Sequence, residues 1–129
     1  MIIDTSALAA IFFGEAEAAR FSQLIYDTER CHISAATLVE LSLVLERRIG
    51  PQAIHQCDLF LRRTGIGIEP FTVEHAHLAR QAYHDFGKGR HPAGLNLGDC
   101  FAYALAKAVG EPLLFKGDDF RKTDVMAAD

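Results

Sequence analysis

Acidic residues at four places in this sequence have the type and setting of a divalent-metal site. Asp4 follows the first apolar residues, Glu40 and Asp99 lie within long apolar runs, and Asp118 and Asp119 follow a third apolar stretch. Carboxylates brought together repel one another, and their pKa values rise unless a cation lies among them. Mg²⁺ accepts such oxygen ligands, and it can activate a water and stabilise the leaving oxygen of a phosphodiester. The histidine-rich ligands typical of zinc are missing.

The predicted local structure places two of these acids at element ends. Asp4 follows a strand over residues 1–3 and precedes a helix that begins at Thr5, a position where open α/β folds bind ligands. Asn96 is the predicted cap of a helix over 96–109, which puts Asp99 in its first turn. Both acids also suit purely structural roles, because Asp is a favoured cap and complements a helix dipole.

Glu40 is predicted in the middle of a helix over 34–48. Apolar residues share its predicted helical face, namely Ala36, Leu43 and Val44. A carboxylate on such a face is costly to bury unless it is paired, protonated or bound to metal. Arg47 and Arg48 lie seven and eight residues further on, beyond the spacing of close helical pairs.

The remaining pattern alternates strands with helices. Strands are predicted over residues 1–3, 30–33, 67–71 and 113–115, with 123–128 as a last short strand or tail. Helices are predicted over 5–13, 15–27, 34–48, 52–64, 72–86 and 96–109. This order predicts an α/β fold with three layers, in which helices cover both faces of a mostly parallel sheet of four or five short strands.

Composition narrows the class of protein. With 129 residues, half of them hydrophobic, the chain suits a single domain over 1–129 with a full core. We expect a cytoplasmic protein, because no stretch is apolar enough for a membrane span and the first residues do not resemble a signal peptide. The net charge of −4 argues against a general nucleic-acid coat protein, but not against an enzyme with acids concentrated at one site. The three cysteines lack C-x-x-C spacing and are expected to be reduced and mostly buried.

One irregular basic stretch precedes the helix of Asp99. Residues 87–95 contain three glycines and a proline, together with Lys88 and Arg90. This segment is either a solvated turn or a pliable loop that approaches a phosphate backbone.

Taken together, these segments resemble a PIN domain, and more narrowly the VapC toxins of bacterial VapBC toxin–antitoxin pairs. The resemblance rests on the opening MIIDTSAL, the internal Glu40, the segment GLNLGDC and the ending PLLFKGDDF, and it covers essentially the whole chain. It implies a PIN-like fold and a Mg²⁺- or Mn²⁺-dependent ribonuclease in which an activated water hydrolyses RNA. It also implies a VapB-like antitoxin that inhibits the enzyme, and a homodimer.

The resemblance also assigns roles to the acids. Asp4 and Asp99 are the implied metal ligands, and Glu40 binds through water or positions the nucleophile. Asp118 or Asp119 completes the site, with Asp119 favoured because its pairing with phenylalanine resembles the usual family ending.

Other polar residues near these acids are candidates for substrate binding. The hydroxyls of Thr5 and Ser6 either contact a phosphate or a metal-bound water, or cap the first helix. Lys88 and Arg90 are the candidate contacts to RNA.

Two other functions fit the same acids. A Mg²⁺-dependent phosphatase or phosphoacceptor domain also gathers Asp residues at strand ends, with a helper lysine for which Lys116 is the obvious candidate. A catalytically inactive PIN-like RNA-binding module is the non-enzymatic alternative. For the ribonuclease, in contrast, hydrolysis by water would leave a 5′-phosphate and a 3′-hydroxyl on the cut RNA.

Overall fold

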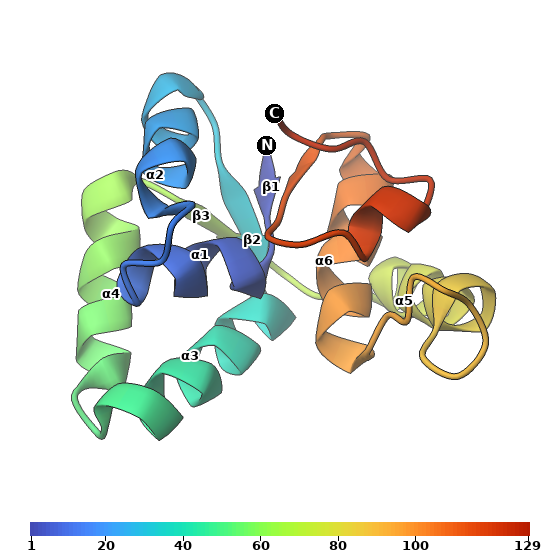
Figure 1. Cartoon of the computed structure of the whole chain (residues 1–129), viewed down its shortest axis with the longest axis horizontal. Helices are drawn as coiled ribbons and strands as arrows, with labels where there is room; N and C mark the ends of the chain where they lie inside the picture. The colour runs from blue at the N-terminus through green and yellow to red at the C-terminus, as the bar shows by residue number, and fades with distance from the viewer.

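The computed structural model describes residues 1–129 and is built on a parallel sheet of four short strands (Figure 1). The strands are β1 (Ile2–Ile3), β2 (His32–Ser34), β3 (Gly67–Glu69) and β4 (Leu113–Leu114). Their order is β3-β2-β1-β4, and every pairing is parallel. This confirms the predicted α/β class, and the sheet has four strands.

Helices cover both faces of this sheet. The helices are α1 (Thr5–Phe12), α2 (Ala18–Asp27), α3 (Ala35–Ile49), α4 (Ala53–Thr64), α5 (Val73–Phe86) and α6 (Leu97–Val109), followed by a short 3₁₀ helix, η1 (Phe120–Lys122). In Figure 1, α1 to α4 lie on one side of the strands, and α5 and α6 lie on the other. The predicted three-layer arrangement is therefore confirmed.

The core is divided by the sheet because neighbouring strand residues point to opposite faces. Ile3 and Leu114 pack into the apolar cluster on the α1–α4 side, whereas Ile2 and Leu113 pack into the cluster on the α5–α6 side. All four of these side chains are almost completely buried. Each of the two-residue strands β1 and β4 therefore contributes one side chain to the core on each side of the sheet.

Side-chain caps fix the starts of two helices near the sheet edge. The hydroxyl of Ser34 accepts a hydrogen bond from the Ala36 N–H at 3.1 Å, and that of Thr72 accepts one from the His75 N–H at 3.1 Å. These bonds satisfy donors that lack partners in the first turn. The predicted starts of α3 and α5 are confirmed.

Two other expectations, one boundary and one helix face, were wrong, and one alternative is decided. The helix predicted from residue 15 begins at Ala18. Residues 123–128, predicted as a short strand or a tail, form a tail with a single bridge between Leu113 and Ala127. The buried face of α3 carries Thr37, Leu41 and Leu45, while Leu43 is 51% exposed. Apolar residues occupy several faces of α3, so periodicity alone did not identify the inner one.

Two further expectations concern the cysteines and the membrane. The three cysteines are free and buried, as predicted. None of the helices combines the length and the apolar character that crossing a bilayer would require.

Candidate active site

Asp4 lies at the junction between β1 and α1 and is 3% exposed. Its Oδ2 accepts a hydrogen bond from the Ser6 N–H at 3.0 Å, whereas its buried Oδ1 has no partner. The pKa of Asp4 is raised from 3.8 to about 7, mainly by burial and to a smaller extent by the charges of Asp99 and Glu40, against the opposing effect of the Ser6 hydrogen bonds. An unpaired buried carboxylate oxygen is costly, so this position is poised to bind a cation.

Asp99 is held at the start of α6 by a reciprocal pair of hydrogen bonds. The Asn96 side chain accepts from the Asp99 N–H at 3.0 Å, and Asp99 Oδ2 accepts from the Asn96 N–H at 3.0 Å. Burial raises the pKa of Asp99 to about 6, and the charges of Glu40 and Asp119 act in the same direction. This capping box fixes the carboxylate before any ligand binds.

Glu40 reaches the same region from α3, which packs against α6. The Thr5 hydroxyl donates a hydrogen bond to Glu40 Oε1 at 2.5 Å. A Cβ atom at position 98 would overlap the Glu40 carboxylate, so Gly98 leaves the space that this carboxylate occupies. The hydrogen bond from Thr5 and the space left by Gly98 together fix the position of the Glu40 carboxylate.

Asp118 and Asp119 are both exposed in the loop after β4. Of the two, Asp119 is the one whose negative charge contributes to the raised pKa of Asp99. The Ser6 hydroxyl accepts a hydrogen bond from the Lys116 N–H at 3.0 Å, which ties this loop to α1. The loop therefore borders the site of Asp4 and Asp99.

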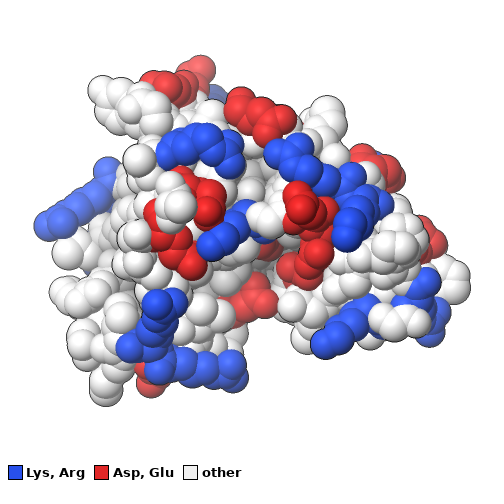
Figure 2. Space-filling model, viewed as in Figure 1, with Lys and Arg blue, Asp and Glu red and all other residues white.

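Four of the predicted acids, Asp4, Glu40, Asp99 and Asp119, lie close enough for their charges to interact, and Asp118 is not among them. Asp4, Glu40 and Asp99 influence one another electrostatically, and Asp119 acts on Asp99. Figure 2 shows acidic side chains gathered around the hollow at the centre of this face, with basic side chains among and around them. Carboxylates gathered around a hollow attract cations.

The predicted substrate-binding residues occupy two different places. Thr5 and Ser6 lie at the acidic site, but their hydroxyls are bonded to Glu40 and to the backbone of the β4 loop. Lys88 and Arg90 line a separate groove between α5 and α6. Their contact with a substrate stays a prediction.

Comparison with known proteins identifies the family. The PIN domain family model matches residues 1–126. The VapC ribonuclease Mb0640 of Mycobacterium bovis is 46% identical over 125 residues, which are 97% of this chain and 95% of that protein. The chain belongs to the VapC family of PIN-domain ribonucleases. This confirms the resemblance seen in the sequence.

Solved structures of this family share the fold. The structure of VapC20 from Mycobacterium tuberculosis, described as a sarcin-ricin loop cleaving toxin, matches with a TM-score of 0.79 and 20% identity, covering 98% of this chain and 97% of that one. VapBC2 from Rickettsia felis, bound to a DNA fragment from its promoter, matches with a TM-score of 0.72 and 18% identity over 98% and 96% of the two chains. At these identities the likeness establishes the fold.

The donor set of this VapC-family chain fits a hard divalent cation. The candidate ligands are carboxylate oxygens, which suit Mg²⁺ or Mn²⁺ better than zinc. No three His, Cys, Asp or Glu side chains lie close enough together to form a complete ligand group. Mg²⁺ usually binds through one or two carboxylates and keeps several waters. The unpaired Oδ1 of Asp4 is the atom best prepared to bind it.

Sequence reasoning missed the contacts that hold these acids. It did not connect Thr5 with Glu40, and it gave Gly98 no role. A glycine in the first turn of an otherwise well-formed helix indicates close approach by another group, which is the signal that was available. It also missed that Lys116 Nζ pairs with Glu15 at 3.1 Å and Glu17 at 3.2 Å.

Proposed function

We propose that this chain is a Mg²⁺- or Mn²⁺-dependent ribonuclease that hydrolyses RNA phosphodiester bonds. The observation that carries this proposal is the buried, unpaired Oδ1 of Asp4, in a carboxylate that is electrostatically coupled to Asp99 and Glu40. Folding has placed these acids together at an energetic cost, and a bound cation would offset that cost. Family membership supplies the class of reaction.

The position of each acidic residue suggests its role in this reaction. Asp4 and Asp99 would hold the metal, which when bound supplies an activated water and neutralises charge that develops on the phosphate oxygens. Glu40, fixed by Thr5 and by the space above Gly98, orients the attacking water and accepts its proton. Asp119 completes the acidic rim through the loop that Ser6 ties to α1. Attack by water leaves a 5′-phosphate and a 3′-hydroxyl.

The phosphoacceptor alternative needs a lysine that is free to assist a nucleophilic Asp. Lys116, the predicted helper, is instead paired with two glutamates of the loop between α1 and α2. This pairing raises its pKa and directs its charge toward those glutamates. The structure therefore offers no support for that role.

We also propose that a VapB-like antitoxin inhibits this chain in the cytoplasm, and that the active form is a homodimer. The R. felis VapBC2 structure provides the parallel for such a partner. An arginine from the antitoxin would suit the acidic site, because its guanidinium binds carboxylates in a bidentate manner and displaces the cation. Inhibition would then weaken as the metal concentration rises.

The decisive experiment incubates the purified chain, free of any partner, with total RNA in Mg²⁺, in Mn²⁺ and in EDTA. Asp4→Asn and Asp99→Asn are run beside Asp58→Asn, which changes an exposed acid on α4 as the matched control. We expect discrete cuts that require metal, vanish in the first two variants and persist in the control. Sequencing of the RNA ends would then identify the cut site and the terminal groups.

Three outcomes would contradict the proposal. Cleavage that survives EDTA would exclude the metal site, and a 2′,3′-cyclic product would exclude attack by water. A protein that cleaves no RNA but still binds Mg²⁺ would favour phosphoryl transfer, for which trapping an aspartyl-phosphate is the test.

A further inference from the structure

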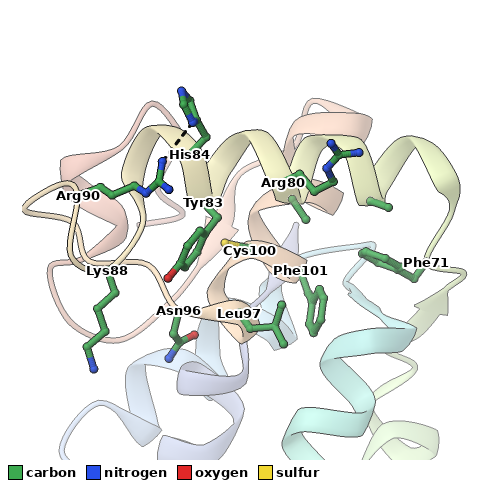
Figure 3. A pocket seen from close by; sticks show the side chains of 12 residues that line it. Phe71, Arg80, Tyr83, His84, Lys88, Arg90, Asn96, Leu97, Cys100 and Phe101 are labelled. Carbon is green, nitrogen blue, oxygen red and sulfur yellow. Dashed lines mark hydrogen bonds between the residues drawn. The ribbon is translucent and has the colours of Figure 1, made fainter.

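A groove of about 740 Å³ lies between α5 and α6 and is bordered by the loop that joins them (Figure 3). Its lining combines aromatic, apolar and basic side chains, among them Phe71, Tyr83, Lys88, Leu97 and Phe101. In Figure 3, Tyr83 projects from α5 into the groove toward Asn96 and Lys88.

This groove adjoins the acidic site. Asn96 lines the groove, and its backbone N–H and side chain form the two hydrogen bonds with Asp99. A molecule held in the groove at Asn96 therefore lies beside the start of α6, where Asp99 is presented. Asn96 therefore links the groove to the Asp99 carboxylate.

The lining presents flat apolar surface to solvent. Leu97 is 69% exposed, Tyr83 42% and Phe71 36%. Phe71 packs edge-on against Phe101, with ring centroids 5.2 Å apart. Exposed apolar side chains that gather beside polar groups mark binding sites rather than ordinary surface.

The charge of the groove is opposite to that of the neighbouring acidic site. Its basic lining residues are Arg80, Lys88 and Arg90, and no carboxylate belongs to the lining. Arg90 also lies against His84, with 3.4 Å between the guanidinium and the ring nitrogen. In a chain with a net charge of −4, this local excess of positive charge favours a polyanion.

We propose that the groove binds an unpaired nucleotide of the RNA beside the bond to be cut. Its base would pack on Tyr83 and the apolar wall, and the flanking phosphates would contact Lys88 and Arg90. Aromatic rings next to basic groups are the combination that recognises single-stranded nucleic acid, whereas a duplex keeps its base faces stacked. This inference rests on the proposed ribonuclease function and assigns part of the RNA-binding surface to the groove at Tyr83.

The test measures binding separately from cleavage. The probes are a fluorescein-labelled octa-adenylate and a fluorescein-labelled RNA duplex of twelve base pairs, titrated with the full chain in EDTA and followed by anisotropy. Tyr83→Ala is compared with Tyr26→Ala, which removes a tyrosine that is 85% exposed on α2. Tyr83→Phe retains a ring for packing, and circular dichroism verifies that each variant folds.

We expect Tyr83→Ala to weaken octa-adenylate binding about tenfold, as for the loss of one base–aromatic contact, while the duplex affinity is unchanged. Tyr83→Phe and Tyr26→Ala should bind octa-adenylate like the wild type. Lys88→Ala should lower the salt dependence of octa-adenylate binding by roughly the contribution of one phosphate, and exposed Arg63→Ala on α4 should not.

Several outcomes would overturn this assignment. One is equal octa-adenylate affinity for Tyr83→Ala and Tyr26→Ala; another is an equal loss for the oligonucleotide and the duplex. If Tyr83→Ala changes the sedimentation of the protein but not its RNA affinity, the groove is instead a contact between copies of the chain.

Total-RNA cleavage in Mg²⁺ separates the two proposals. If the wild type cleaves RNA but Tyr83→Ala binds octa-adenylate normally, only the groove assignment fails. If Tyr83→Ala loses binding but the wild type never cleaves, only the ribonuclease proposal fails.

Discussion

Ionisation of Asp4 should destabilise the metal-free protein as the pH rises from 5 to 7, and Asp4→Asn should remove most of that effect. The pKa of Asp4 is about 7 in the folded chain, compared with an ordinary value of 3.8, because the carboxyl group is buried. Between these values the folded state binds more protons than the unfolded state. The free energy of unfolding is therefore highest at low pH, falls as the pH rises toward 7, and levels off above it.

The size of this effect follows from the two pKa values. Each pH unit of difference corresponds to about 1.4 kcal/mol, so full ionisation of Asp4 costs about 4 kcal/mol of folding free energy. About 2 kcal/mol of this cost falls between pH 5 and pH 7. Burial of Asp4 is nearly complete, with 3% of the residue exposed, so solvent screening reduces the cost little.

Urea unfolding in EDTA, followed by circular dichroism at several pH values, measures this prediction. With a slope of about 2 kcal/mol per molar urea, the wild-type midpoint should fall about 1 M further than that of Asp4→Asn between pH 5 and pH 7. A smaller decline should remain in the variant because the pKa of Asp99 is also raised, to about 6. Exposed Asp58→Asn should follow the wild type.

Adding Mg²⁺ at pH 7 should restore wild-type stability, because the bound ion stabilises only the folded state. It should do little for Asp4→Asn. Parallel pH curves for the wild type and Asp4→Asn would refute the reasoning, since they would show that Asp4 is ionised in the folded chain without cost.

Gly98→Ala should lower RNA cleavage about 10- to 100-fold while the protein still folds, because the added Cβ displaces the carboxylate of Glu40. Glu40→Ala should cause a similar loss, and combining the two should cost little more; additive losses in the double variant would argue against a shared mechanism. Asp119→Asn should reduce cleavage about tenfold or more and Asp118→Asn much less, and the reverse order would assign the fourth acid to Asp118. Cleavage removed by EDTA should return with Mg²⁺ or Mn²⁺, and the metal affinity measured by calorimetry should rise with pH up to about 7 because Asp4 must lose its proton; a pH-independent affinity would contradict this.

The sequence by itself determined the elements and two positions of the site. Helix caps and helical periodicity depend on residues within about four positions of one another, so both can be predicted from the sequence alone. The roles of Asn96 and Ser34 as caps and the place of Asp99 in the first turn of α6 were predicted in this way. The alternation of strands and helices then brought Asp4 to the carboxyl edge of a parallel sheet.

Tertiary structure alone decided how the remaining groups meet. The position of the Glu40 carboxylate depends on the space beside Gly98, which belongs to another helix and lies 58 positions further along the sequence. Packing between elements distant in the sequence also decides three other features. These are the exposure of Leu43, the charge of Asp119 near Asp99 and the groove beside Tyr83. Local patterns fix the direction of a side chain around its own helix, but packing between distant elements fixes which other groups it contacts.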